Sequence, residues 1–345
     1  MTRIRCIAAS VFVLALIIAP GLFAQSTAPT GFDQNTPLFR VNVNVVTVDA
    51  AVMNKKTGRA IGPLTPQDFS LYENGIPQRI SYFSQDELPL SVVLLFDLTD
   101  SVRPVLESLS KGALSALDHL KPQDEVSVMV YAASTELLQD FTTDRTLAAA
   151  AIKRASKMQS DEAAFFNEGL YQAAQQTTRA GSPNNRRVII WLTDNVPNFP
   201  SDEIRRRYGR SLAHAELHTE KQALDVLFRA GPMVCALVDR SIISDEETMS
   251  RNAHWGDYVL QRFQYPPGDV YRYAQQTGGE VAESNAKRMP QKLADMIDSI
   301  RARYTIGYKP ASAATGFREI QLRLAPESEH RFGRVNVVAK KGYYR

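Results

Sequence analysis

Cysteine is almost absent from this chain, which has only Cys6 and Cys235 among its 345 residues. The first lies in an N-terminal segment that we expect to be removed, so Cys235 would be the only thiol left and no internal disulfide can form. Cys235 stands in an apolar run at residues 233–238, where an inert core side chain is expected. The fold therefore has no disulfide framework, even in an oxidising compartment.

A large charge of one sign is also missing. The chain has 40 basic and 37 acidic residues. Removing the N-terminal segment takes away Arg3 and Arg5 and leaves 38 basic residues against 37 acidic ones. This near balance argues against a general nucleic-acid binder or a protein that binds anionic membranes. We find no Ser/His/Asp or Cys/His arrangement and no glycine-rich phosphate loop, so we expect a protein that is not an enzyme.

Only one stretch approaches the length of a membrane span, and it is N-terminal. Arg3 and Arg5 precede the apolar residues 7–22, and Ala24 is a small residue before Gln25. This pattern predicts a secretory signal peptide at residues 1–24 and export to the periplasm or the exterior. An uncleaved anchor is the alternative. The polar residues 25–37 then form a flexible linker.

Residues 38–87 have a β pattern. Val41, Val43 and Val45 alternate with polar residues, as in a half-buried strand. The Asn74-Gly75 pair predicts a tight hairpin turn between strands at residues 69–72 and 80–83.

The pattern changes over residues 88–303, where apolar runs alternate with helical spacings. Strands are predicted at residues 90–96, 126–130, 188–192 and 233–238, and helices at residues 106–120, 147–158, 166–177 and 219–229. Strands that alternate with helices predict an α/β fold with a doubly wound, mostly parallel sheet. Ligands of such sheets bind beyond the carboxyl ends of the strands.

The C-terminal part, residues 304–345, returns to a β pattern. We expect a closing helix at residues 289–304, followed by strands at residues 305–308, 320–324 and 335–338. This β segment either pairs with residues 38–87, so that the α/β domain is inserted in a β-rich one, or forms a separate extension.

Hard oxygen donors gather where two of the predicted strands end. Asp97 follows the apolar run at residues 90–96, and Thr99 and Ser101 follow it at two-residue steps. Asp194 follows the run at residues 188–192 and can reach the same edge of the sheet. Carboxylates and hydroxyls suit Mg²⁺, Mn²⁺ or Ca²⁺ rather than zinc or copper.

These residues carry a resemblance to a known family. Asp97, Thr99 and Ser101 match the D-x-[ST]-x-S element of von Willebrand factor type A domains, and the sequence LTDN at residues 192–195 resembles the LTDG element of the same fold. The sequences LTPQDF at residues 64–69, YENG at residues 72–75 and KGYY at residues 341–344 resemble the Acidobacteria-type subgroup of such proteins. The resemblance covers nearly all of the chain after the signal peptide.

The resemblance implies a metal-ion-dependent adhesion site. Thr99 and Ser101 would bind a divalent cation directly, while Asp97 and Asp194 would act directly or through water. An Asp or Glu of a protein partner would complete the coordination shell. The resemblance therefore implies a protein-binding module without catalysis.

Two positions depart from the family pattern. Ala164 stands where the family supplies a Thr ligand, and an alanine cannot bind a metal. Asn195 replaces the usual Gly, which is compatible because Asn adopts similar turn conformations. Either the site holds its ion without that Thr, or it is degenerate and Asp97 caps the following helix or hydrogen-bonds to loop backbone.

Three other readings remain. Asp97 at a strand end also resembles the nucleophile of phosphotransferases, but Thr99 stands where that chemistry needs a second Asp. His214 and His218 have the spacing of a zinc pair on a helix, against which a solvated helix face is the simpler explanation. The loop at residues 241–268 contains Trp255 and Tyr258, which either pack the loop onto its own domain or let a scaffold bind a partner there without a metal. A basic patch includes four arginines: Arg205, Arg206, Arg207 and Arg210.

Overall fold

The computed structural model describes residues 45–85, 87–99, 101–132, 134–158, 165–195, 218–239, 269–285 and 287–345. Several sequence-based predictions concern residues outside these ranges: the signal peptide, the linker, the strand residues before Val45, Ala164, the arginine patch, His214 and the loop at residues 241–268. Within the described ranges, no helix is long and apolar enough to cross a membrane.

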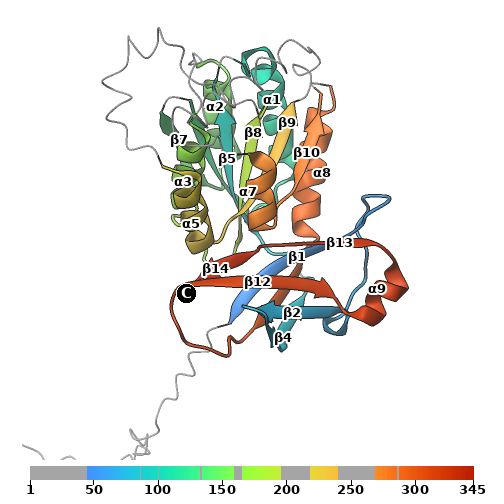
Figure 1. Ribbon diagram of the computed structural model, residues 1–345. Helices are drawn as coiled ribbons and strands as arrows, with labels where there is room; N and C mark the ends of the chain where they lie inside the picture. The colour runs from blue at the N-terminus through green and yellow to red at the C-terminus, as the bar shows by residue number, and fades with distance from the viewer. Residues whose placement is uncertain are drawn as a thin grey trace, which may run out of the picture. The chain divides into compact units, whose positions relative to one another are not determined.

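A six-stranded sheet forms the centre of the fold (Figure 1). All of its neighbouring strands are parallel except the last pair, which is antiparallel. Its strands are, in spatial order, β10 (Val281–Ser284), β9 (Met233–Asp239), β8 (Arg186–Thr193), β5 (Leu90–Asp97), β6 (Glu125–Tyr131) and β7 (Thr135–Thr142). Every residue of β5 and β9 is buried, as expected for strands that are covered on both faces. The predicted doubly wound, mostly parallel sheet is confirmed.

Helices cover both faces of this sheet (Figure 1). Alternate side chains of β5 point to opposite faces: Leu94 and Phe96 pack in one core cluster, and Val93 and Leu95 pack in the other. The first cluster also contains side chains of α1 (Arg103–Ala116), α2 (Arg145–Ala155) and α8 (Met289–Arg301), and a short 3₁₀ turn, η2 (Leu117–His119), extends α1. The second contains side chains of α3 (Phe166–Thr177), α5 (Glu220–Ala230) and α7 (Val270–Thr277).

The segments before and after this α/β unit pair with each other. One antiparallel sheet has the order β13 (Val335–Ala339), β1 (Val46–Asn54), β11 (Tyr304–Tyr308) and β4 (Ile80–Ser84). A second has the order β14 (Gly342–Tyr344), β12 (Phe317–Leu324), β2 (Phe69–Glu73) and β3 (Ile76–Gln78). The turn η1 (Pro66–Asp68) precedes β2, and α9 (Pro326–Phe332) joins β12 to β13.

The two antiparallel sheets share one apolar core. Val48 and Ile306 come from the first sheet, and Leu71 and Leu322 come from the second; all four belong to the same buried cluster. Residues of β1 and β11 that alternate with core residues face away from this cluster, as the two-residue period of a strand requires. The observed pairings thus join the two flanks. Where one domain ends and the other begins stays a prediction from the sequence.

The predicted hairpin has the expected turn but a different second strand. Asn74 and Gly75 have φ values of 48° and 76°, the left-handed conformations that a two-residue hairpin turn requires. The turn brings Glu73 opposite Ile76, so β2 pairs with β3 directly after the turn. The predicted partner at residues 80–83 was wrong: it belongs to β4, which pairs with β11 in the other sheet.

The closing helix is shorter than predicted. It ends at Arg301 instead of continuing to Tyr304, because Tyr304 pairs with Ala50 as the first residue of β11. The helical spacing of the apolar residues could not reveal this competing tertiary pairing. Other elements were not predicted from the sequence, among them β3, β7, β10, β14, α7 and α9; of these, β3, β10 and β14 are only three or four residues long.

Candidate metal centre

Asp97 and Asp194 lie at the carboxyl edge of two neighbouring strands. Strands β5 and β8 are parallel and paired in register from Leu90 opposite Arg186 to Phe96 opposite Leu192. Asp97 is the last residue of β5, and Asp194 follows the last residue of β8. Both side chains are completely buried. The pattern of the sequence correctly predicted that these two carboxylates share one edge of the sheet.

Asp97 is held by four hydrogen bonds from the protein. Its Oδ1 accepts from the backbone N–H of Thr99 at 3.0 Å and from the Thr99 hydroxyl at 2.7 Å. Its Oδ2 accepts from the Tyr131 hydroxyl at 2.8 Å and from the Thr193 hydroxyl at 2.7 Å. An ionised carboxylate has about four acceptor positions, so these donors use all of them. Asp97 therefore supplies charge and fixes its neighbours, and no acceptor position remains for a cation at this geometry.

Tyr131, one of the residues that hold Asp97, links it to a second buried side chain. The Tyr131 hydroxyl, which donates to Asp97, accepts in turn from the indole N–H of Trp191 at 2.8 Å. Burial and the neighbouring Asp97 carboxylate raise the pKa of Tyr131 well above its usual value, so the phenol keeps the proton that it donates. Neither Tyr131 nor Trp191 was predicted as a site residue, because both come from other strands and their roles depend on tertiary contacts.

Thr193 also contributes to the site and was not predicted as a site residue. Its hydroxyl donates to Asp97 and accepts from the backbone N–H of Asn195 at 3.0 Å. Thr193 stands directly before Asp194, inside the LTDN sequence that carried the resemblance, so a signal for it was present. The loop that follows β8 is thereby tied to the end of β5.

Thr99 and Ser101 place two hydroxyl oxygens 3.2 Å apart, and Thr99 is completely buried. A hydroxyl has one proton and two lone pairs, and Thr99 uses its proton on Asp97. Ser101 must therefore be the donor in the contact between them. Among the described residues, no donor uses the second lone pair of Thr99.

The spacing of these hydroxyls fits a small hard cation. Mg²⁺ prefers octahedral geometry with oxygens at about 2.0–2.1 Å, so adjacent ligands lie about 3.0 Å apart. The separation between the Thr99 and Ser101 oxygens is close to this value. Two buried carboxylates at the same edge, Asp97 and Asp194, supply the compensating negative charge. The chemistry of these donors therefore fits a divalent ion.

Burial raises the pKa of Asp97, and the hydrogen bonds from Thr193, Thr99 and Tyr131 oppose this shift. A carboxylate buried without a counter-ion is electrostatically unfavourable in its charged form. A divalent cation beside it would favour the charged form. A cation at this buried position would therefore strongly stabilise the charged form of Asp97.

The residue after Asp194 has a left-handed backbone conformation. Asn195 has a φ of 59°, in the left-handed region that favours Gly and tolerates Asn. Its side-chain Oδ1 accepts from the backbone N–H of Val270, the first residue of α7, at 3.3 Å. The prediction that Asn can replace the usual Gly here is confirmed, and Asn195 adds a link to α7 that Gly could not make.

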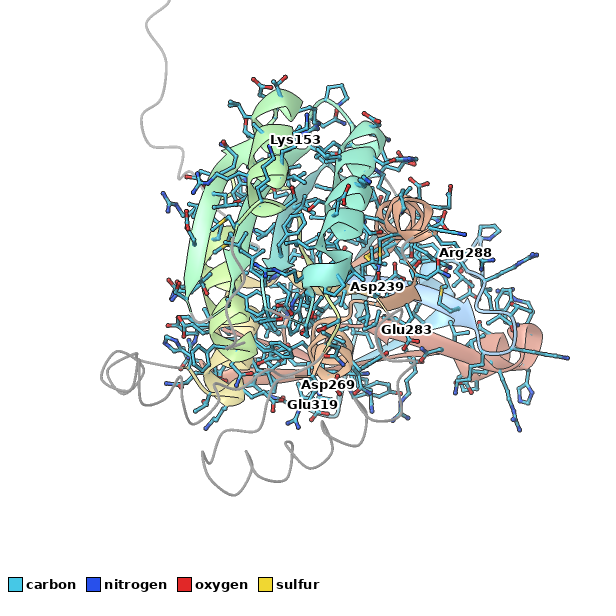
Figure 2. All side chains as sticks on the ribbon, turned by 90° about the horizontal axis from the view of Figure 1, so that it is seen from above. Lys153, Asp239, Asp269, Glu283, Arg288 and Glu319 are labelled. Carbon is cyan, nitrogen blue, oxygen red and sulfur yellow. The ribbon has the colours of Figure 1, made fainter. Side chains whose placement is uncertain are left out.

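Two further acidic residues lie along the same edge. Asp239 ends β9 and is completely buried, and Glu283 lies beside it on β10, where Ser284 is paired with Asp239. Figure 2 shows both labelled residues close together at this edge. Asp239 follows an apolar run in the same way as Asp97, so the rule used for Asp97 would have found it. Among the described residues, no three His, Cys, Asp or Glu side chains form a group that could hold a metal by themselves. The hydroxyls of Thr99 and Ser101 are therefore essential to the candidate site.

The degenerate alternative is only partly matched by the contacts. Asp97 does bond to loop backbone, at the N–H of Thr99. It does not cap α1, whose N-cap residue is Val102 and has no side-chain capping bond.

Of the two histidines considered as a zinc pair, the one that the structure describes, His218, does not lie on a helix. His218 lies two residues before α5, where Nδ1 is 2.6 Å from Glu168 Oε2 and the ring stacks on Tyr171. His214 is outside the described residues. Cys235 is completely buried, and burial raises the pKa of its thiol to about 12, as expected for an inert core residue.

Comparison with known proteins identifies the central segment. Residues 92–196 match the family described as von Willebrand factor type A domain. No curated protein matches the chain. This matched segment begins in β5, ends directly after the Asp194 loop, and so includes all four candidate ligands.

Several solved structures are similar to this chain. One is a von Willebrand factor type A protein from Catenulispora acidiphila, with 10% identity over 88% of this chain and 75% of that chain and a TM-score of 0.43. Another is the vWF domain of the type V pili tip protein Mfa5 from Porphyromonas gingivalis, with 10% identity over 62% and 95% of the chains and a TM-score of 0.42. A third is the conserved hypothetical protein BatB from Bacteroides thetaiotaomicron, with 15% identity over 61% and 99% and a TM-score of 0.37. The family match thus covers residues 92–196, a segment that lies within the doubly wound sheet.

Proposed function

We propose that this protein is an exported protein-binding module that coordinates one divalent cation at the carboxyl edge of its central sheet. The observation that carries this proposal is the convergence of two buried carboxylates and two hydroxyls at the ends of adjacent strands. Thr99 and Ser101 would bind Mg²⁺, Mn²⁺ or Ca²⁺ directly, and Asp97 and Asp194 would neutralise it. When bound, the ion would supply an electrophilic centre that attracts an Asp or Glu of a protein partner.

Each residue has a distinct part in this proposal. Asp97 orients the Thr99 hydroxyl by accepting a hydrogen bond from it, so that a lone pair of Thr99 is directed away from Asp97. Tyr131 and Thr193 hold the other oxygen of Asp97 and thereby fix the carboxylate in one orientation. Ser101, which is partly exposed, would exchange its contact with Thr99 for the ion. Such supporting bonds typically change metal affinity about 10- to 100-fold when removed.

The cellular location and the subgroup of the protein are also part of what we propose. The predicted signal peptide supports secretion or a periplasmic location, and the flanking sequence elements support the Acidobacteria-type subgroup. The partner is a protein, and neither nucleic acid nor an anionic membrane is expected to bind a chain so nearly balanced in charge.

A phosphohydrolase that uses Asp97 as its nucleophile is the rival from another class. Asp97 is completely buried, and all its acceptor positions are occupied by protein donors, which disfavours attack by either oxygen on a substrate. We therefore propose that the module has no catalytic activity.

Thermal unfolding with and without divalent ions tests the proposed function. Bound ligand stabilises a fold by RT ln(1 + [L]/Kd), so ions at about 100 times their Kd would add about 2.7 kcal/mol. We expect the gain in the wild type and its loss in Ser101→Ala. The matched control is Ser91→Ala, because Ser91 lies at the opposite end of β5 and its hydroxyl also donates to a buried carboxylate, that of Glu125, at 2.6 Å. This control should keep the full gain.

The same samples separate the alternatives. Turnover of a generic phosphate ester that disappears in Asp97→Asn would favour the phosphohydrolase and contradict our proposal. Partner binding that is insensitive to chelators but is lost when residues 241–268 are deleted would favour the metal-independent scaffold.

A further inference from the structure

A polar cavity lies at the opposite end of the central sheet from the candidate metal centre. Its volume is about 360 Å³, within the range of small-ligand pockets. Its lining residues come from the amino ends of β8 and β9 and from the β-sheet that contains β1, β11 and β13. Figure 1 shows these elements next to each other. We call it the interdomain cavity. Its charged lining residues are three cations and one acid: Arg186, Arg187, Lys340 and Asp49.

One of these cations has an acidic partner in the protein, although its Nε has no hydrogen-bond partner among the described residues. Arg186 is almost completely buried and forms an ion pair with Asp49 at 3.0 Å. Its guanidinium also donates to the Thr305 hydroxyl at 3.1 Å and to the backbone oxygen of Arg301 at 3.3 Å, near the end of α8. Arg186 and Asp49 therefore neutralise each other and connect the α/β unit to β1 and β11.

The other two cations have no acidic partner. Among the described residues, neither Arg187 nor Lys340 forms an ion pair. Arg187 donates from Nη1 to the backbone oxygen of Ala230 at 3.1 Å, at the end of α5, while its buried Nε has no hydrogen-bond partner in the described part of the chain. Lys340 is partly buried, and this burial lowers its pKa, although Asp49 opposes the shift. Charges removed from water are normally paired, and among the described residues the lining of the cavity has two more cations than acids.

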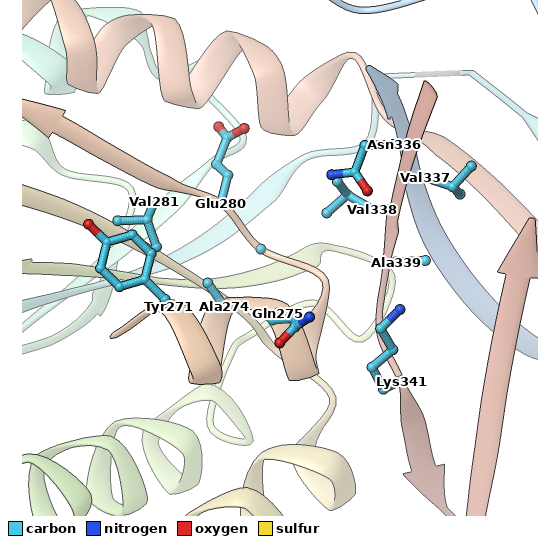
Figure 3. A pocket seen from close by; sticks show the side chains of 11 residues that line it. Tyr271, Ala274, Gln275, Glu280, Val281, Asn336, Val337, Val338, Ala339 and Lys341 are labelled. Carbon is cyan, nitrogen blue, oxygen red and sulfur yellow. The ribbon is translucent and has the colours of Figure 1, made fainter. Parts of the chain in front are cut away.

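A second cavity provides a comparison, because its charged lining residues are balanced in sign. This cavity, of about 280 Å³, lies between α7, β10 and β13 (Figure 3). Its charged lining residues are Glu280 and Lys341, one of each sign. Glu280 also accepts from the Ser299 hydroxyl at 3.1 Å. It has no excess of cations and gives no indication of a charged ligand.

We propose that the interdomain cavity binds a small oxyanion with two negative charges, such as a phosphate or a dicarboxylate, between Lys340 and Arg187. Two charges on the ligand would neutralise the two unpaired cations, and the Arg187 Nε would gain an acceptor. The amide side chains of Asn184 and Asn185, which also line the cavity, offer further donors. This site is independent of the proposed cation site, because the two lie at opposite ends of the strands.

Calorimetric titration of the purified protein with inorganic phosphate and with malonate, at constant ionic strength, tests this inference. We expect saturable binding of at least one of them, and the two arms distinguish phosphate from dicarboxylate chemistry. Lys340→Met and Arg187→Gln should each weaken binding about tenfold or more, because a hydrogen bond to a charged group is lost. Lys341→Met is the matched control, since this neighbouring lysine is exposed and does not line the cavity. It should leave the affinity unchanged.

The folded state of each variant can be checked without the ligand. Removal of an unpaired, partly buried charge should leave the melting temperature of Lys340→Met equal to or above that of the wild type, so a loss of anion binding would not reflect unfolding. No saturable binding of either anion to the wild type would overturn the inference. Equal weakening by Lys340→Met and Lys341→Met would also overturn it, because binding would then depend on general surface charge.

Discussion

Replacing Tyr131 with Phe removes a single oxygen from the network that holds Asp97. This hydroxyl donates to Asp97 at 2.8 Å and accepts from the indole N–H of Trp191 at 2.8 Å. All three side chains are buried, with exposed fractions of 1% or less. The substitution therefore leaves a carboxylate with one donor fewer and an indole N–H without an acceptor, and the shape of the core is almost unchanged.

The expected cost follows from these two losses. A hydrogen bond to a charged group contributes about 1.5–3 kcal/mol, and a buried donor without a partner costs about 1–3 kcal/mol. Because both losses involve the same oxygen and local relaxation recovers part of them, we expect the free energy of unfolding to fall by about 2–4 kcal/mol. The same change should weaken divalent-cation affinity about tenfold, since the orientation of Asp97 is less well fixed.

Urea unfolding of the metal-free protein measures this cost, and Tyr273→Phe is the matched control. Tyr273 is buried in the same core and its ring also contacts Trp191, but its hydroxyl donates to the neutral amide oxygen of Asn167 at 2.7 Å. A neutral hydrogen bond contributes about 1 kcal/mol. Tyr131→Phe should therefore be the more destabilising variant. Equal losses in the two variants would refute the reasoning, because Asp97 would then not act as a buried charge that depends on Tyr131.

Three other predictions concern stability and reactivity elsewhere in the fold. Arg301→Met should lower the free energy of unfolding in urea by about 3–5 kcal/mol, because it leaves the completely buried Asp124 without its ion-pair partner. The control Lys111→Met, at an exposed ion pair, should change the free energy of unfolding by less than about 0.5 kcal/mol. Similar losses in the two variants would contradict this view. Cys235 should not react with a thiol reagent at pH 8 until denaturant is added, since it is buried and its pKa is about 12, whereas rapid labelling of the native protein would contradict its core position. Lys340 has a folded-state pKa below 10.5, so the unfolded chain binds more protons between these two values and stability should rise with pH there. Urea unfolding at several pH values should show a smaller rise in Lys340→Met, and an identical pH dependence would exclude the shift.

Much of the fold was predictable because hydrophobic period and chain order are local information. The apolar run before Asp97 identified a buried strand, and the alternation with helices predicted parallel neighbours. Since parallel strands end at one edge, the joint position of Asp97 and Asp194 followed from the same pattern. The second strand of the Asn74-Gly75 hairpin was wrong because residues 80–83 form an equally good strand and pair in the other sheet. Sequence period alone does not decide between partners.

The residues that hold Asp97 in place from neighbouring strands could not be predicted from the sequence. Tyr131 lies 34 residues from Asp97, and Trp191 lies 60 residues from Tyr131, yet the three form one hydrogen-bonded chain. In the sequence, both aromatic residues look like ordinary core side chains of apolar strands, and they are indeed core residues. Their polar atoms acquire a role only when the sheet brings neighbouring strands together. The unpaired charges of Arg187 and Lys340 were hidden for the same reason, because they come from separate parts of the chain.

Calorimetric titration of the metal-stripped protein with Mg²⁺, Mn²⁺ and Ca²⁺ tests the central claim most directly. Our account predicts saturable binding of at least one ion, with one ion per chain, and loss of that binding in Asp97→Ala and Ser101→Ala but not in Ser91→Ala. This result would establish a working site even though Ala164 replaces the usual Thr. No binding of any of the three ions to the wild type would contradict the account and leave an α/β protein whose partner must be recognised without a metal.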